Sequence, residues 1–214
     1  MKPARRSFVT DDGLTLVADA YGDPEAPPVL LQHGGGQTRH SWRGTARALA
    51  ARGFHALAID LRGHGDSDWD PARDYRFGRY ARDTVAVARA LPRPPALVGA
   101  SLGGLAALLA TAAGEGPRFP ALVLVDITPR MDEQGAMAVL SFMRERVEEG
   151  FASLEEAADA IARYLPHRPR PRDLSGLRKN LRQGADGRWR WHWDPAFVQG
   201  RGPGSPGREN EVEA

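Results

Sequence analysis

The chain is 214 residues long, which suits a single domain with a buried core. Its hydrophobic fraction of 42% and charged fraction of 26% are typical of a folded globular protein and argue against disorder along the whole chain. No apolar run approaches the roughly 18 residues needed to cross a bilayer, and residues 1–6 lead into no apolar signal core. We therefore expect a cytoplasmic protein without a membrane partner.

Cysteine is absent, which excludes disulfides, thiolate nucleophiles and cysteine-based zinc sites. The formal net charge is +2, and nearly all of the basic residues are arginine in a chain that is also rich in alanine, glycine and proline. Such a balance gives little evidence for nucleic acid, so we expect none as a partner. The arginine-rich stretch 163–182 could bind an acidic partner, although a solvated surface is the simpler interpretation.

The first half of the chain has the pattern of an α/β fold. Strands at 7–9 and 14–21 flank the turn signal Asp11-Asp12-Gly13, which predicts a hairpin at a sheet edge. Apolar strands then alternate with helices, which predicts a mostly parallel sheet with helices on both faces. We expect strands at 29–32, 56–61, 96–99 and 121–126, and helices at 46–50, 80–91 and 102–113. The strand at 121–126 is continuously apolar, as in strands buried on both faces, and it is the last clear strand.

Beyond Pro129 the pattern changes to a helical cap. Helices are expected over 137–147, 154–161 and 174–181, and Trp189, Trp191 and Trp193 alternate with polar residues in a strand or an aromatic loop. Residues 199–214 have too much glycine and proline, and too few apolar side chains, to form an element. We therefore predict a core at 1–130, a cap at 131–198 and a disordered tail at 199–214.

The stretch Gly99-Ala100-Ser101-Leu102-Gly103 fits the pattern G-x-S-x-G between a predicted strand and a predicted helix. Glycines are needed on both sides because the serine lies on a strained turn where a side chain would collide with backbone, and Gly104 adds clearance. The helix that follows directs its N–H groups toward developing negative charge. A glycine-rich turn without catalysis is the alternative.

The stretch His33-Gly34-Gly35-Gly36 follows another predicted strand, and its backbone N–H groups could bind an oxyanion. A phosphate-binding loop is less suitable because no Walker lysine follows it and it does not match GxGxxG. A plain flexible turn is the remaining alternative.

These two stretches, together with Asp60-Leu61-Arg62-Gly63-His64-Gly65-Asp66-Ser67, resemble the α/β-hydrolase superfamily, in the branch of small esterases, cofactor-free haloperoxidases and carbon–carbon bond hydrolases. The resemblance implies an α/β-hydrolase fold and a small ester or related acyl substrate, with no cofactor or metal. It also implies Ser101 as the nucleophile and the N–H groups of Gly35 and Leu102 as the oxyanion hole. Related epoxide hydrolases and haloalkane dehalogenases have aspartate in place of this serine, so the chain departs from them. His64 is expected to be a hydrogen-bonded loop residue.

The resemblance leaves the catalytic histidine unaccounted for. In the family the histidine follows the last strand, beyond the cap, and none of the 6 histidines here lies behind a late strand. Asp126 is a possible acid or simply caps a turn, and His192 is expected to be a surface residue of the cap. We therefore predict a truncated fold with impaired activity and an exposed sheet edge. A non-catalytic remnant or small-molecule-binding module is the alternative.

Overall fold

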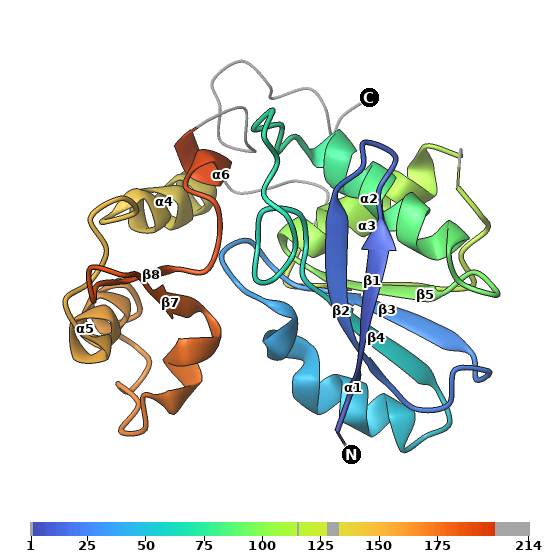
Figure 1. Cartoon of the computed structure of the whole chain (residues 1–214), viewed down its shortest axis with the longest axis horizontal. Helices are drawn as coiled ribbons and strands as arrows, with labels where there is room; N and C mark the ends of the chain where they lie inside the picture. The colour runs from blue at the N-terminus through green and yellow to red at the C-terminus, as the bar shows by residue number, and fades with distance from the viewer. Residues whose placement is uncertain (1, 115, 128–132, 200–214) are drawn as a thin grey trace.

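A computed structural model describes residues 2–114, 116–127 and 133–199. Figure 1 shows a core built on a sheet and a smaller unit of helices and short strands beside it, which we call the cap. The cap comprises residues 133–199, and the core comprises the described residues before them. The division into a core at 1–130, a cap at 131–198 and a tail at 199–214 stays a prediction, and its residues 1, 115, 128–132 and 200–214 lie outside the described ranges.

The core contains a six-stranded sheet in the order β1-β2-β4-β3-β5-β6. β1 pairs with β2, and β2 with β4, in antiparallel fashion, whereas β4, β3, β5 and β6 are parallel neighbours. The predicted edge hairpin and the predicted parallel sheet are both confirmed. The strands are β1 (Ala4–Val9), β2 (Thr15–Tyr21), β3 (Pro28–Gln32), β4 (His55–Ile59), β5 (Ala96–Ala100) and β6 (Leu122–Val125).

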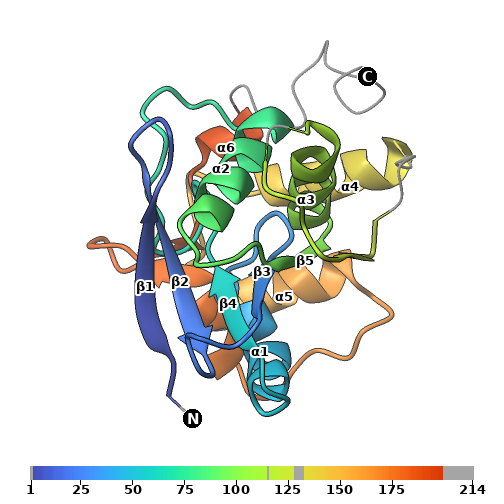
Figure 2. The same ribbon diagram turned by 90° about the vertical axis from the view of Figure 1, so that its right-hand side faces the viewer.

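Helices lie on both faces of this sheet. In Figure 2, α1 (Arg43–Ala50) lies on one face, and α2 (Phe77–Arg89) and α3 (Leu102–Ala112) lie on the other. On the α2 and α3 face the strands bury Leu30, Leu57 and Leu97, and on the α1 face they bury Leu31 and Ala58. Alternate residues of each strand therefore enter opposite cores, as the period of two requires.

The expectation that the last strand of the sheet is buried on both faces is wrong. β6 pairs only with β5 among the described residues, and Val123 and Val125 are 48% and 39% exposed. The apolar run gave no sign of this, because burial depends on neighbours that a single strand does not specify.

The cap differs from its prediction in several details. Its helices are α4 (Glu133–Arg144), which ends before Val147, and α5 (Leu154–Tyr164). The expected helix at 174–181 is a short 3-10 helix, η2 (Ser175–Lys179), followed by β7 (Leu181–Gln183). The alternating tryptophans lie partly in β8 (Trp189–Trp191), which pairs with β7. Gln199, assigned to the tail, ends the short helix α6 (Ala196–Gln199), and residues 200–214 lie outside the described ranges.

Candidate active site

Ser101 lies between the end of β5 and the first residue of α3, in a strained backbone conformation. Its φ of 46° and ψ of −115° place it in a region that non-glycine residues seldom occupy. The side chain is exposed, and its hydroxyl has no hydrogen bond to any of the described residues. The fold therefore presents a free hydroxyl at the carboxyl end of the central parallel strands.

The backbone around Ser101 leaves no room for side chains at the flanking glycines. A Cβ on Gly99 would lie 2.3 Å from the carbonyl oxygen of Gly103, and one on Gly103 would lie 2.5 Å from that of Gln32. Both distances are far below any tolerable contact with rigid backbone. This close approach agrees with the predicted need for glycine on both sides of Ser101.

The loop 33–36 after β3 packs against this turn. The N–H of Gly103 donates to the carbonyl oxygen of His33 at 3.1 Å, and a Cβ on Gly34 would lie 3.4 Å from that of Ser101. The two glycine-rich segments, far apart in the sequence, thus meet at one end of the sheet. Parallel strands bring their carboxyl ends to the same edge, so this meeting follows from the topology.

Two amides at this point have no acceptor within the described part of the chain. The N–H of Gly34 donates to Gln37 Oε1 at 3.3 Å and that of Gly36 to His64 Nε2 at 3.2 Å, whereas no bond is made by the N–H of Gly35. The N–H of Leu102, the first of α3, also lacks an acceptor. The arrangement therefore offers two unused donors close to Ser101.

The cap contributes apolar side chains to the other side of the glycine loop. A Cβ on Gly35 would lie 3.3 Å from Phe197 Cζ, and one on Gly36 would lie 3.0 Å from Met143 Cε and 3.7 Å from Trp193 Nε1. All three side chains are nearly inaccessible to solvent. The sequence motifs gave no indication of these contacts, because α4, α6 and the segment before α6 meet the loop only in the tertiary structure.

The neutral rings of His33 and His64 hold the loop 33–36 through contacts with backbone groups. His33 Nδ1 contacts the carbonyl oxygen of Gly34 at 2.8 Å while its Nε2 accepts from the N–H of Leu61 at 3.0 Å. His64 Nδ1 contacts the carbonyl oxygen of Arg62 at 3.0 Å, and Gly36 occupies its Nε2. Burial lowers the pKa of His33 to about 4 and that of His64 to about 3. Since backbone groups occupy both ring nitrogens, neither histidine is free to take a proton from Ser101, and His64 is the loop residue expected.

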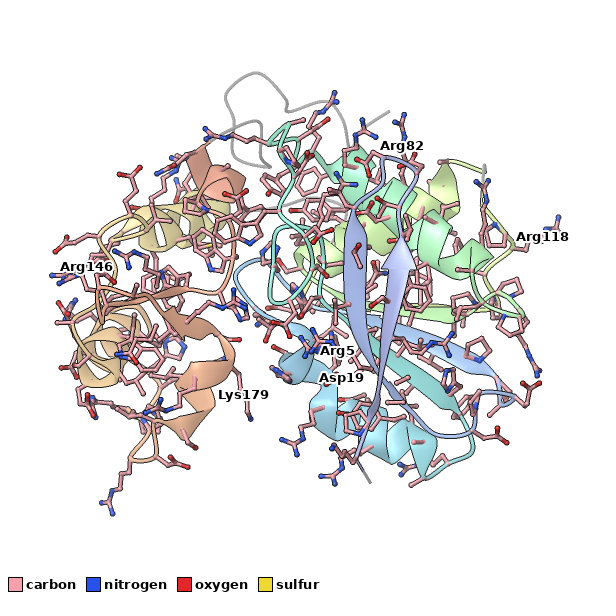
Figure 3. The ribbon with its side chains drawn as sticks, viewed as in Figure 1. Arg5, Asp19, Arg82, Arg118, Arg146 and Lys179 are labelled. Carbon is pink, nitrogen blue, oxygen red and sulfur yellow. The ribbon has the colours of Figure 1, made fainter. Side chains whose placement is uncertain are left out.

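The expectation that His192 is a surface residue is wrong. Its side chain is only 15% exposed and lies between the cap and the core, with Nε2 at 3.7 Å from Asp66 Oδ1. Asp66 also forms ion pairs with Arg5, Arg39 and Arg182, the last from the cap. Figure 3 shows Arg5 and Asp19 on the core side of this junction and Lys179 on the cap side. His192 therefore helps to hold the cap against the core, and no hydrogen bond joins it to Ser101, both of which are described residues.

The three other histidines lie elsewhere. His55 begins β4, at the opposite end of the sheet from Ser101, and His40 lies near Asp19 in the segment before α1. His167 is exposed in the cap. Within the described ranges, no histidine hydrogen-bonds to the Ser101 hydroxyl.

Asp126 follows β6 with a φ of 54° and is exposed. The preceding residue, Val125, accepts a hydrogen bond from the N–H of Ser101 at 3.2 Å. Asp126 therefore follows the strand that pairs with β5, and it lies at the same end of the sheet as Ser101. This position suits an acid that orients a base, and equally suits a residue that ends a strand.

A cavity of about 690 Å³ lies between α2 and α3, and none of its lining residues belongs to the loop 33–36 or the Ser101 turn. Its lining includes Arg76 and Arg79, both of which form ion pairs with Asp74. Volume alone makes a pocket only a default candidate. The chemical groups at Ser101 identify the site better than this cavity does.

None of the helices in the described ranges is long and apolar enough to span a membrane. The histidine, aspartate and glutamate side chains of these ranges form no group of three or more that could hold a metal ion.

Comparison with known proteins gives consistent matches. The family model for the alpha/beta hydrolase fold matches residues 27–172. An esterase of Mycobacterium tuberculosis is 34% identical over 184 residues, covering 79% of this chain and 57% of the esterase. Its solved structure has a TM-score of 0.64 over 92% of this chain and 67% of that one, at 29% identity.

Two more proteins extend the comparison. Mouse protein phosphatase methylesterase 1 is 33% identical over 140 residues, which cover 63% of this chain and 36% of that protein. An alpha/beta hydrolase structure from Novosphingobium aromaticivorans has a TM-score of 0.75 at 27% identity and covers 92% of this chain and 70% of its own. The matched part of this chain thus covers 57% of the mycobacterial esterase and 36% of the methylesterase, less than two thirds of either curated relative.

Proposed function

The chain belongs to the α/β hydrolase family, and from this premise we propose that it is a serine hydrolase that forms an acyl-enzyme on Ser101. Its substrate would be a small ester or a related acyl compound, as the names of the esterase and methylesterase relatives suggest. The observation that carries the proposal is the strained, exposed Ser101 beside two backbone amides that have no acceptor among the described residues.

In this mechanism the Ser101 hydroxyl attacks the carbonyl carbon of the substrate, and the N–H groups of Gly35 and Leu102 stabilise the oxyanion that forms. A fixed donor of this kind contributes about 10²–10³-fold to the rate in serine hydrolases, because it requires no reorganisation as the charge develops. The N-terminus of α3 adds favourable partial positive charge. Phe197 and Met143 would exclude water from this side of the oxyanion.

Full activity needs a general base for the Ser101 proton, because an unassisted serine hydroxyl is a weak nucleophile at neutral pH. The histidines of the described residues make no hydrogen bond to Ser101. We therefore propose that these residues alone catalyse ester hydrolysis only weakly, because they supply no general base. Serine enzymes stripped of their triad keep about 10³–10⁴-fold acceleration over water through the oxyanion hole and binding. Weak, Ser101-dependent turnover is the expected activity, and Asp126 is the proposed acid for a base supplied from elsewhere.

The proposal is tested by hydrolysis of p-nitrophenyl acetate and by labelling with a fluorophosphonate probe. We expect slow turnover and slow labelling that disappear in Ser101→Ala and persist in Ser41→Ala, since Ser41 is another exposed serine. Labelling that is equal in the wild type and in Ser101→Ala would disprove the assignment of the nucleophile.

A second candidate is a non-catalytic module of the same fold that binds a small acyl compound. This candidate is favoured because no histidine of the described residues hydrogen-bonds to the Ser101 hydroxyl. In that case calorimetry would detect binding of a short-chain carboxylate or ester in the wild type and in Ser101→Ala alike, while neither would be labelled or turn over ester.

A further inference from the structure

Gln37 directly follows the glycine loop 33–36, and the backbone at this point is fixed on both sides. The N–H of Gln37 donates to the carbonyl oxygen of Gly34 at 3.1 Å, which closes a turn. The next residue, Thr38, is buried, and its hydroxyl donates to the carbonyl oxygen of Lys179 in the cap at 3.1 Å. Gln37 is therefore an exposed residue on a well-held segment, where the core loop meets the cap.

The side chain of Gln37 is bound at only one of its two polar ends. Its Oε1 accepts from the N–H of Gly34 at 3.3 Å, so a second bond joins Gln37 to the same glycine. An amide oxygen accepts and an amide nitrogen carries two donor hydrogens, so this bond fixes which end faces Gly34. The Nε2 group donates to no described residue. Two donor hydrogens are therefore available on a side chain whose position is already set.

The amide of Gln37 lies beside the candidate nucleophile. A Cβ built on Gly34 would lie 3.6 Å from Gln37 Oε1 and 3.4 Å from the Cβ of Ser101, so the two side chains flank the same point of the loop. Both side chains are exposed. A molecule bound at Ser101 therefore lies within reach of the Gln37 amide.

Support of the loop does not by itself explain a glutamine at this position. The bond to the N–H of Gly34 needs only an acceptor oxygen, which the carboxylate of a glutamate would also provide. Glutamine differs from glutamate because it adds two donor hydrogens and brings no negative charge to a site where an oxyanion is proposed to form. Both differences suit a residue that contacts an oxygen of a bound substrate.

We propose that Gln37 is a substrate-binding residue whose Nε2 donates to a second oxygen of the substrate, close to the scissile ester group but not part of it. The preferred substrates are then esters that carry an ether, hydroxyl or carbonyl oxygen a few bonds from that group, rather than plain alkyl esters. The identity of the bound molecule as an ester rests on the proposed function. The donor itself can be tested without turnover.

The test measures binding by the full chain in a Ser101→Ala background, which cannot form an acyl-enzyme. Two pairs of ligands each differ by one ether oxygen in place of a methylene group: benzyl methoxyacetate with benzyl butyrate, and 2-methoxyethyl phenylacetate with butyl phenylacetate. The first pair varies the acyl side and the second pair varies the alcohol side. NMR titration gives each Kd, and the ratio of the two Kd values in a pair is the preference for the ether. In at least one pair, we expect this preference to be about three- to tenfold greater with Gln37 than in Gln37→Leu.

Gln37→Glu separates the donor from the support of the loop. Its carboxylate can still accept from the N–H of Gly34, so hydrogen exchange at that amide should stay as slow as in the parent, while the preference for the ether is lost. Gln183→Leu is the matched control, because Gln183 is an exposed glutamine of β7 whose Nε2 donates to the carbonyl oxygen of Gly187 at 2.9 Å within the cap. The control should keep the preference of the parent.

The outcomes distinguish this inference from the proposed function. A preference that persists in Gln37→Leu or Gln37→Glu, or that is also lost in Gln183→Leu, overturns the role of Gln37 even if the chain shows Ser101-dependent turnover. Failure of all four esters to bind overturns it as well. A preference lost only in the Gln37 variants supports the role, and a lack of Ser101-dependent turnover would then count against the proposed function alone.

Discussion

The strained backbone of Ser101 and the close packing of the segments around it depend on each other. The left-handed φ of this residue brings β5, α3 and the end of β3 so close that Gly99 and Gly103 contact backbone atoms of other segments. Strain of about 1–3 kcal/mol at such a residue persists only where the surroundings hold it. The glycines therefore matter for stability as well as for the exposure of the serine.

Gly103→Ala tests this dependence. Its Cβ would lie 2.5 Å from the carbonyl oxygen of Gln32, so we expect a loss of about 3 kcal/mol in unfolding free energy. For a chain of this size that lowers the melting temperature by about 6–12 °C in a thermal melt.

Gly44→Ala is the control. Gly44 lies in α1 with no atom within 4 Å of an added Cβ. The substitution should raise stability by up to about 1 kcal/mol, because alanine favours the helix. A Gly103→Ala melt unchanged from the wild type would show that the contact is relieved at no cost.

At the scale of elements, the helix α5 begins with a side-chain cap that its sequence specifies. Ser153 Oγ accepts from the N–H of Glu156 at 3.1 Å, and the carboxylate of Glu156 accepts from the N–H of Ala152 at 2.5 Å. The spacing Ser-x-x-Glu is the signature of a capping box. The first bond satisfies the amide of Glu156, one of those that the first turn of a helix leaves free, and the second satisfies the amide of Ala152, which precedes the N-cap.

Ser153→Ala removes the cap. We expect the unfolding free energy to fall by about 1 kcal/mol, measured by urea denaturation with an unchanged m-value. Ser141→Ala, at an exposed position inside α4, should have almost no effect. If both variants lose the same stability, the cap makes no specific contribution.

For the whole molecule, the buried neutral histidines make stability depend on pH. The pKa of His33 is about 4 and that of His64 about 3 in the folded chain, because burial disfavours the charged ring. In the unfolded chain both return to about 6.5. As pH falls below that value, the unfolded state binds protons that the folded state does not, so stability decreases with acid.

We expect the unfolding free energy to fall by about 2 kcal/mol for each of these histidines between pH 7 and pH 5. Urea denaturation at several pH values measures this loss. His64→Gln should be less stable at pH 7 but should have a shallower decrease toward pH 5, whereas His167→Gln, at an exposed position, should keep the wild-type slope. A wild-type stability that is constant over this range would contradict burial of the neutral rings.

The strand–helix alternation and the edge hairpin could be predicted from the sequence, because local periodicity is recognised without knowing any long-range contact. The position of the loop 33–36 beside Ser101 was an implication of the family resemblance, and it agrees with the rule that parallel strands end at one edge of the sheet. The glycine spacing around Ser101 was similarly informative, because it reflects a steric requirement within a few residues.

The side chains that surround Ser101 and the loop 33–36 could be identified only from the three-dimensional structure. The burial of His192 against Asp66, the contact of Phe197 with Gly35 and the exposure of Val123 and Val125 all depend on elements distant in the sequence. Periodicity reports which face of an element is apolar, and it does not report what covers that face. Packing between distant segments places Phe197, Met143 and Trp193 against the glycine loop and gives β6 a partner strand on one side only among the described residues, and no local pattern contains this information.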